Sequence, residues 1–251
     1  MSRRNDLLLA STPLMGLLAL WCLLTYTGAV APLFLPSPTA VIRAGWLMFV
    51  HERFSDDVLL SLARVFGGFL ASVLLAVPFG LVIGSSARMD VVFAPLFGFI
   101  RYIPATAFIP LVILWFGIGF LQNVVLVFIS IFFYLALLVG DSARAVKQDL
   151  VDTALTLGAE RRQVLVRVVL PRAMPDIWNS MRTMFGVGWT MIVVAELVGA
   201  ETGVGAKIIH AQRFLQTPKV LAGIFVIGML GAACDLTFRA LHRAFFPWAH
   251  L

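Results

Sequence analysis

The sequence predicts an all-α integral membrane protein built as a six-span helical bundle. Hydrophobic residues make up 61% of its 251 residues and charged residues only 13%, which is far more apolar than a water-soluble domain of this length. The apolar residues gather in long stretches, each near the roughly 20 residues that a helix needs to cross a bilayer. Basic residues lie in the short segments between these stretches, so the net charge of +6 indicates membrane topology and no nucleic-acid partner.

Six stretches meet the length and hydropathy of membrane spans. They cover about residues 7–27, 58–83, 93–117, 123–141, 177–199 and 219–241. The first exceeds the roughly 7–15 apolar residues of a secretory signal, so we expect it to remain as a span. Spans and loops use the whole chain, and we expect one transmembrane domain over residues 1–251 with core spans within 58–241.

The segment between the first two spans is rich in proline and then amphipathic. Pro32, Pro36 and Pro38 predict an extended connection. Residues 39–54 then place apolar side chains opposite basic ones, which predicts a helix lying on the outer membrane surface.

Lysine and arginine residues in the loops predict the orientation of the spans. With the N-terminus inside, eleven of the 19 basic residues fall on the cytoplasmic side and five on the outer side, while three lie within spans. The cytoplasmic residues are Arg3, Arg4, Arg88, Arg144, Lys147, Arg161, Arg162, Arg167, Arg172, Arg239 and Arg243. We therefore expect a multi-pass membrane protein with both termini in the cytoplasm.

The longest cytoplasmic loop, about residues 144–172, has the pattern of a helical hairpin. Residues 148–157 have helical composition, Gly158 permits a sharp reversal, and residues 160–170 resume an amphipathic helix that we expect Pro171 to end. The hairpin would project from the membrane with four small or apolar side chains partly exposed, which favours a protein partner that covers them. These side chains are Val151, Ala154, Leu155 and Leu157.

This loop resembles the cytoplasmic loop of ABC importer permease subunits, which are the inner-membrane components of binding-protein-dependent transport systems. In that family Glu-Ala-Ala is followed by a Gly and, further on, by an apolar residue and Pro. Asp152-Thr153-Ala154, Gly158-Ala159 and Leu170-Pro171 occupy these places, with Asp152 in place of Glu and Thr153 in place of the first Ala.

The resemblance extends over about residues 34–248 and is closest to the nitrate, sulfonate and taurine class. The segments that carry it are Leu35–Pro38, Ser61–Arg64, Arg101–Pro104, Phe108–Leu111, Trp115–Gly119, Ala195-Glu196, Gly203–Gly205 and Pro247-Trp248. The resemblance implies a type I importer fold with a second permease copy, two separate ABC ATPase subunits, and a periplasmic or lipid-anchored solute-binding protein. It also implies a coupling helix that contacts the ATPase through Asp152, Thr153, Ala154, Leu157, Gly158, Ala159, Glu160 and Pro171.

The cargo that this class implies is a small anion resembling nitrate, a sulfonate or bicarbonate. The same permease type also imports neutral and heterocyclic solutes, so that alternative stays open. No GxxxxGK[ST] segment is present to cradle phosphates, so ATP would be used by the partner ATPase and this chain would bind no cofactor. An ATP-independent channel or secondary transporter is the competing interpretation.

No catalytic residue is predicted, because the sequence has no HExxH or GxSxG motif and no paired Asp in facing spans. The four histidines lack metal-ligand spacing, and no metal is expected. Cys22 and Cys234 lie in apolar runs and are expected to be packing residues.

Ionisable and aromatic residues within the spans are candidates for the transport pathway or its gate. Arg101, followed by Tyr102 and Pro104, lies where a proline can break the helix and open a cavity, and an anion-pathway role and a structural role both remain open. For Glu196, near the outer end of the fifth predicted span, a role in an outer gate or in docking is favoured over a side chain that simply extends to the interface. Trp115 would shape the mouth of the pathway or anchor its helix at the interface.

Three further charged residues in the spans are expected to be structural. Arg64 would extend toward the outer interface and Arg182 toward the inner one. Asp235 would pair with Arg239, one helical turn later.

Overall fold

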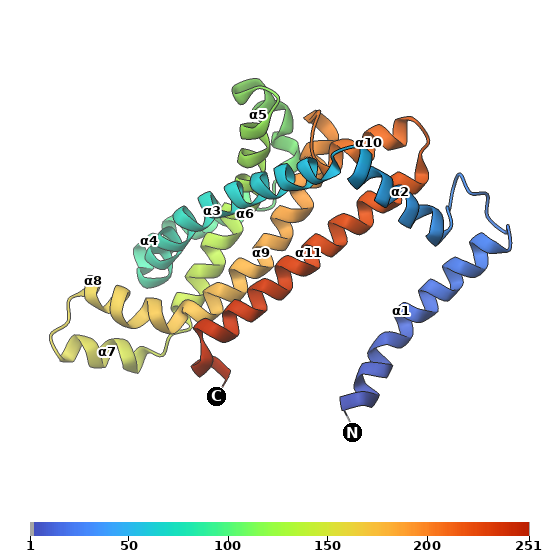
Figure 1. Ribbon diagram of the computed structural model, residues 1–251. Coiled ribbons are helices and arrows are strands. Elements are labelled where there is room, and N and C mark those ends of the chain that lie inside the picture. Colours follow the sequence, from blue (N-terminus) through green and yellow to red (C-terminus); the bar gives the residue numbers. More distant parts are fainter. Residues whose placement is uncertain (1–2, 251) are drawn as a thin grey trace.

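The computed structural model describes the backbone of residues 3–250, with side chains from Thr12 to Trp248 apart from position 199. All regular structure in this part of the chain is helical, as predicted (Figure 1). The helices are α1 (Arg3–Tyr26), α2 (Pro38–His51), α3 (Phe54–Ser85), α4 (Ala87–Ile100), η1 (Ala105–Phe108), α5 (Ile109–Phe116), α6 (Phe120–Arg144), α7 (Gln148–Thr156), α8 (Arg161–Val164), η2 (Leu165–Val169), α9 (Leu170–Gly199), α10 (Val204–Arg213), α11 (Thr217–Phe245) and η3 (Pro247–His250).

The number of helices able to cross a membrane agrees partly with the six predicted spans. Within the described residues, four are long and apolar enough, and the bent pair of α4 with η1 and α5 raises this to five. The four are α3, the continuous helix from α8 to α9, α6 and α11. The apolar part of α1 covers Thr12–Tyr26, which is shorter than these.

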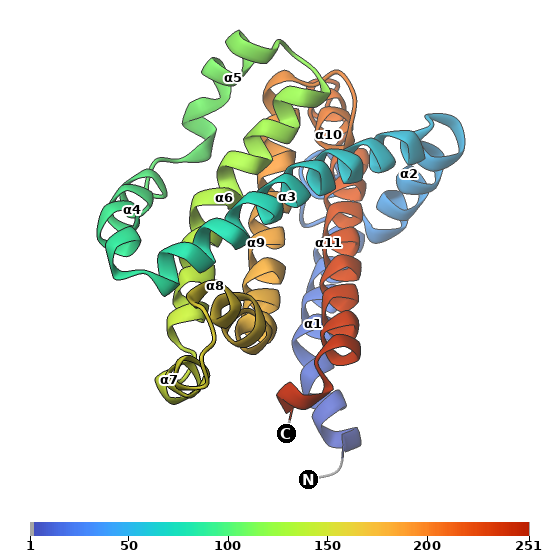
Figure 2. The same ribbon diagram turned by 90° about the vertical axis from the view of Figure 1, so that its left-hand side faces the viewer.

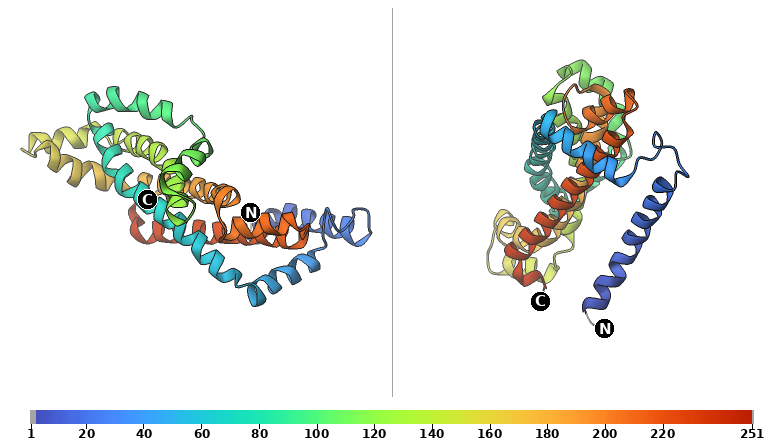
Figure 3. Two further views of the ribbon diagram at one scale, coloured as in Figure 1. Left: turned by 90° about the horizontal axis from the view of Figure 1, so that it is seen from above. Right: turned by 45° about the vertical axis from the view of Figure 1, so that its right-hand side comes forward.

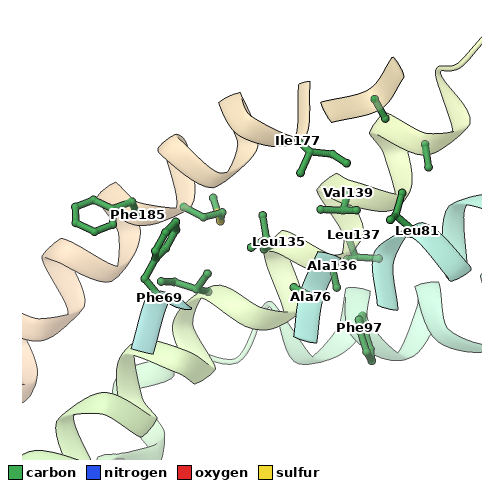
Figure 4. Close-up of a cluster of buried hydrophobic side chains, with 14 of the residues drawn as sticks. Phe69, Ala76, Leu81, Phe97, Leu135, Ala136, Leu137, Val139, Ile177 and Phe185 are labelled. Atoms are coloured by element: carbon green, nitrogen blue, oxygen red, sulfur yellow. The ribbon is translucent and has the colours of Figure 1, made fainter. Parts of the chain in front are cut away.

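The centre of the bundle is formed by α3, α6 and α9, whose buried apolar side chains make one large cluster (Figure 4). Small residues allow α3 and α6 to approach closely. A Cβ added at Gly80 would lie 2.6 Å from Cβ of Val139, and one at Gly84 would lie 2.8 Å from Cβ of Ala143. In a membrane, where lipid is as apolar as the side chains, such close packing is a main source of helix association.

Both chain ends lie at the same end of the bundle as α7 and α8, and α2, α5 and α10 lie at the opposite end (Figures 1 and 2). We call the end with α7, α8 and the two termini the inner end, and the end with α2, α5 and α10 the outer end. Helix α1 runs beside the bundle and is attached near its outer end by Trp21, whose ring stacks on Phe225 with 5.6 Å between centroids (Figures 1 and 3). The Trp21 indole N–H also donates to the carbonyl of Pro36 at 3.0 Å.

The amphipathic segment after α1 forms α2, as predicted, and it packs on the bundle. Ser37 accepts a hydrogen bond from the N–H of Ala40, which caps the helix start. Val41 and Met48 are buried against α10 and α11, whereas Trp46 on the opposite face is 70% exposed.

The third predicted span, residues 93–117, is not one helix. Helix α4 ends at Ile100, the chain turns through Arg101 to Pro104, and η1 with α5 continue in a direction bent by 80°. Pro104 lacks an N–H and disfavours helical geometry in the residue before it, so the helix cannot continue through this point. The break opens the cavity described below.

The prediction that Pro171 ends the helix after Gly158 is wrong. A π-helical turn, η2, precedes Pro171, and the helix from Arg161 runs on into α9 as one span of 38 residues. The N–H of Leu170 donates to the carbonyl of Leu165, five residues back. The wider π turn accommodates the N–H that Pro171 lacks. Pro171 therefore lies in the first turn of α9, a position where proline is well tolerated.

Candidate coupling loop and transport cavity

The hairpin at the inner end is a helix, a glycine corner and a second helix. Gly158 has φ of +86°, a conformation that costs other L-residues energy. Its N–H donates to the carbonyl of Leu155 at 2.9 Å, and the N–H of Ala159 donates to the carbonyl of Ala154 at 3.0 Å. This pair of bonds is the Schellman motif that ends many helices, and here it fixes the reversal after α7.

The second arm of the hairpin is fixed by a capping box. Glu160 and Gln163 exchange side-chain and backbone hydrogen bonds at the start of α8, and the N–H of Glu160 donates to Oε1 of Gln163 at 3.0 Å. Both sides of the corner are therefore held by local hydrogen bonds, which makes the hairpin a stiff projection.

The two faces of α7 differ in what they contact. Val151 and Ala154 are half-buried against the main apolar cluster of this chain, so the chain itself covers part of their surface. Leu157 is 83% exposed and borders a shallow hollow formed with polar side chains of α7. The polar members are Asp149, Asp152, Thr153 and Thr156.

Asp152 faces solvent from the middle of this free surface. One oxygen of its carboxylate accepts from Nε2 of Gln148 at 3.0 Å, and no ion pair to Asp152 occurs within the described residues. Its charge is thus available to a partner, whereas Pro171 lies away from this face, in the first turn of α9.

The break between α4 and η1 forms one wall of a cavity of about 300 Å³, and α6 and α9 form the others. Most of the lining is apolar, with polar groups from five side chains. These are Arg101, Thr106, Ser130, Tyr134 and Thr190.

Arg101 carries a charge that no acidic side chain of the described residues balances. It forms no ion pair there, its Nε is buried without a hydrogen-bond partner, and its Nη2 donates to the hydroxyl of Tyr102 at 3.3 Å. The guanidinium carbon lies 5.1 Å from the ring centroid of Tyr102 and 5.9 Å from that of Tyr134. Cation–π contacts stabilise the cation without neutralising it, so the cavity keeps a net positive charge.

The other predicted pathway residues divide between this cavity and elsewhere. Pro104 lines the cavity, and Tyr102 contacts Arg101 while remaining 75% exposed. Trp115 is exposed on α5 and does not line the cavity.

Glu196 lies outside the cavity, in a buried ion pair with Arg64. Nη1 of Arg64 donates to Oε1 of Glu196 at 2.7 Å, and both side chains are almost fully buried. The expectation that Arg64 extends to the outer interface is therefore wrong. A buried pair of this kind is retained only when further hydrogen bonds satisfy it, and here Ser61 donates to both carboxylate oxygens of Glu196.

This ion pair also holds the start of α10, the outer helix that follows α9. The N–H groups of the first residues of α10 have no partner within the helix. Those of Gly203, Val204 and Gly205 donate to three side chains at 2.7, 3.0 and 2.9 Å. The acceptors are Asp57, Ser61 and Glu196 respectively.

A family model described as binding-protein-dependent transport system inner membrane component matches residues 76–249. The chain belongs to this family. It is therefore a permease subunit of an ABC transporter, as the sequence predicted, and a multi-pass protein of the bacterial inner membrane.

The names of similar proteins support the class that the sequence indicated. The permease is 35% identical to the taurine transport system permease protein TauC of Escherichia coli (strain K12), over 92% of this chain and 86% of that protein. It is 31% identical to the putative aliphatic sulfonates transport permease protein SsuC of Bacillus subtilis (strain 168), over 92% and 84%. The bicarbonate transport system permease protein CmpB of Synechococcus elongatus is 25% identical, over 95% and 89%.

Solved structures share the fold of the permease. An inward-facing form of the MetNI methionine ABC transporter aligns with a TM-score of 0.69 at 18% identity, covering 79% of this chain and 97% of that one. An amino acid ABC transporter aligns with a TM-score of 0.60 at 20% identity, covering 76% and 92%. The type I importer fold is thus confirmed.

Several residues that define the permease's sites were not found from the sequence. Tyr134, Ser130 and Thr190 complete the Arg101 cavity, but each lies in an apolar span where only the folded packing of α6 and α9 shows its direction. Within the described residues, no group of three or more His, Cys, Asp or Glu side chains could hold a metal.

Proposed function

We propose that this permease forms the transport pathway of an ATP-driven importer for a small anion of the sulfonate or bicarbonate kind. The uncompensated positive charge of Arg101 in the cavity between α4, α6 and α9 carries this proposal. A charge inside a membrane protein is costly unless it pairs with something, and a transported anion would provide the missing partner. The relatives' names, which include taurine, aliphatic sulfonates and bicarbonate, agree with that chemistry.

The assembly proposed here has two copies of this chain, two ABC ATPase subunits at the inner end and a solute-binding protein at the outer end. In this proposal each copy has six spans and both termini in the cytoplasm, which would put α7 on the ATPase side. The free face of α7, where Asp152 makes no ion pair within the described residues and Leu157 is exposed, supports this placement. The proposed coupling contact covers Asp152, Thr153, Leu157 and Gly158.

A solute with a sulfonate or bicarbonate group needs a positive charge along the transport pathway, whereas a neutral solute does not. Arg101→Gln removes the charge and keeps much of the volume, whereas Arg101→Lys keeps the charge but loses the planar contact with the tyrosines. We expect Gln to reduce uptake at least tenfold and Lys to retain more of it. Arg88→Gln, which removes an exposed inner-end cation on α4, is the matched control.

The experiment uses the full complex in proteoliposomes, with ATP inside and radiolabelled taurine or bicarbonate delivered by the binding protein. Uptake and ATP hydrolysis are measured for each variant. Equal uptake by Arg101→Gln and the wild type would remove the anion-pathway role of Arg101. Uptake without ATP would instead favour the channel or secondary-transporter alternative.

A further inference from the structure

A second positively charged cavity lies at the inner end of the bundle, between α9 and α11. These helices run side by side (Figures 1 and 2). The cavity has a volume of about 210 Å³ and is lined by Asn179, Arg182, Arg239, His242 and Arg243. It is separate from both the Arg101 cavity and the hollow on α7, which share no residue with it.

The charges around this inner cavity do not cancel. Both Arg182 and Arg239 pair with Asp235, with Nη2 of Arg182 at 3.1 Å and Nε of Arg239 at 2.9 Å from Oδ2. Arg243 is the third guanidinium and makes no ion pair within the described residues. Three arginines against one carboxylate leave an excess of positive charge that attracts an anion.

One face of α9 connects the two cavities. Thr190 lines the Arg101 cavity and Asn179 lines the inner one. Thr183 and Gly186 lie between them at spacings of four and three residues, which places all four on one face of the helix, and all four are exposed. The eleven residue steps from Asn179 to Thr190 rise about 16 Å along the helix axis.

The other sides of α9 are covered by the chain itself, so this exposed face is a distinct feature. On one side, a Cβ added at Gly188 would lie 2.6 Å from Cδ1 of Ile131 on α6. On the other, Trp189 donates from its indole to the carbonyl of Ile227 on α11 at 3.1 Å. The hydroxyls of Thr183 and Thr190 bond to carbonyls of their own helix, so the face is polar but holds no strong anion site of its own.

We propose that the inner cavity is a second anion site, where the transported solute arrives along this face of α9 before release into the cytoplasm. The proposal rests on the proposed import of an anion. Transport requires that no single site hold its ligand too tightly, and a second attractive site lowers the cost of leaving Arg101. Further along the same face toward the inner end lie Arg172 and Asp176, one cation and one anion that together add no net charge, so the excess remains at the cavity.

The phosphate of an anionic phospholipid has the same charge chemistry as the solute and could reach a basic cavity at this depth. The two sources differ in what competes for the site. A lipid phosphate would block the cavity in membranes containing phosphatidylglycerol and leave it open in pure phosphatidylcholine, whereas a solute site stays open in both.

The test uses the charge selectivity of a thiol reaction at the cavity wall. Asn179→Cys is introduced in a Cys22→Ala/Cys234→Ala background, and the full complex is reconstituted. The reagent 2-sulfonatoethyl methanethiosulfonate carries an ethylsulfonate anion, and its trimethylammonium analogue carries a cation. The rate of the anionic reagent is divided by the rate of the cationic one, both for the Asn179→Cys thiol and for free 2-mercaptoethanol. The first ratio divided by the second measures the preference for anions at the cavity.

We expect a preference of about tenfold or more for the anionic reagent, in both lipid compositions. Arg239→Gln/Arg243→Gln should bring it close to one, Arg239→Lys/Arg243→Lys should retain it, and Arg88→Gln should leave it unchanged. An unreactive thiol in the Asn179→Cys variant, or no anion preference, would overturn the site. A preference abolished by phosphatidylglycerol would assign the cavity to lipid and overturn the solute site.

Uptake measured on the same vesicles separates this inference from the proposed function. Normal ATP-driven import of taurine or bicarbonate by the Asn179→Cys variant, without an anion preference of its thiol, would overturn the inner site alone. A strong anion preference with no ATP-driven import of either solute would overturn the proposed function and, with it, the solute as the occupant.

Discussion

Replacing Gly158 by proline should uncouple the permease from ATP hydrolysis. Gly158 has φ of +86°, whereas proline fixes φ near −65° and has no N–H. The substitution removes the hydrogen bond to the carbonyl of Leu155, which contributes about 1 kcal/mol. Proline also disfavours the near-helical conformation of Leu157, which has φ of −77° and ψ of 5°.

A left-handed conformation alone costs an ordinary L-residue about 1–2 kcal/mol, so Gly158→Ala gives a lower bound. Proline adds the cost of the lost hydrogen bond and cannot adopt the native φ, so we expect Gly158→Pro to cost about 3 kcal/mol or more. A cost of this size lowers the population of the native corner roughly a hundredfold. The apparent affinity for the ATPase should fall by the same factor, because only the correctly shaped corner binds. Gly158→Ala should reduce that affinity about 5- to 30-fold.

The assay compares binding-protein-stimulated ATP hydrolysis and solute uptake in proteoliposomes for the wild type and both variants. Val166→Leu, at a half-exposed position on η2, is the control for a change on the second arm that leaves the corner intact. Full assembly, stimulation and uptake by Gly158→Pro would refute the assignment of this hairpin as the coupling element.

Three further predictions concern the ion pair, the helix packing and the topology. Glu196→Ala should destabilise the purified complex by about 3–5 kcal/mol because it leaves Arg64 buried and unpaired, and Arg64→Met in the same chain should restore part of the loss; thermal unfolding in detergent measures both, and a neutral single variant would contradict this. Gly84→Val should separate α3 from α6, since even a Cβ would lie 2.8 Å from that of Ala143, and a normal yield of folded permease would argue against it. In intact cells, an impermeant thiol reagent should label Ser55→Cys but not Gln163→Cys, and labelling of the latter would reverse the proposed topology.

The buried pair between Glu196 and Arg64 changes how the outer end of the permease is understood. The sequence suggested a gate or docking residue, but the carboxylate bonds to α3 on one side and to the first turn of α10 on the other. The pair thus joins α3 and α9 through two residues that lie 132 positions apart in the chain. A contribution of Glu196 to gating would then act through the position of α10, because the side chain itself is 1% exposed.

The sequence by itself determined those features that depend only on residues close together in the chain. Long apolar stretches predicted the spans, since a helix in lipid must satisfy its own backbone. Gly158 predicted the corner because only a residue without Cβ adopts that φ cheaply. The pairing of Asp235 with Arg239, one turn apart on α11, is confirmed at 2.8 Å for the same reason.

Tertiary structure decided what depends on neighbours distant in the chain. The rule that prolines end helices predicts the same outcome for Pro104 and Pro171. In the structure, Pro104 lies beside an 80° bend, whereas Pro171 follows a π turn inside a continuous span. Arg182 was assigned to the interface by its position along the span, but Asp235 on α11 lies within reach and pairs with it. A side chain's position along a span follows from counting residues, whereas its partner depends on which face of another helix packs against it, and that is fixed only when the whole bundle assembles.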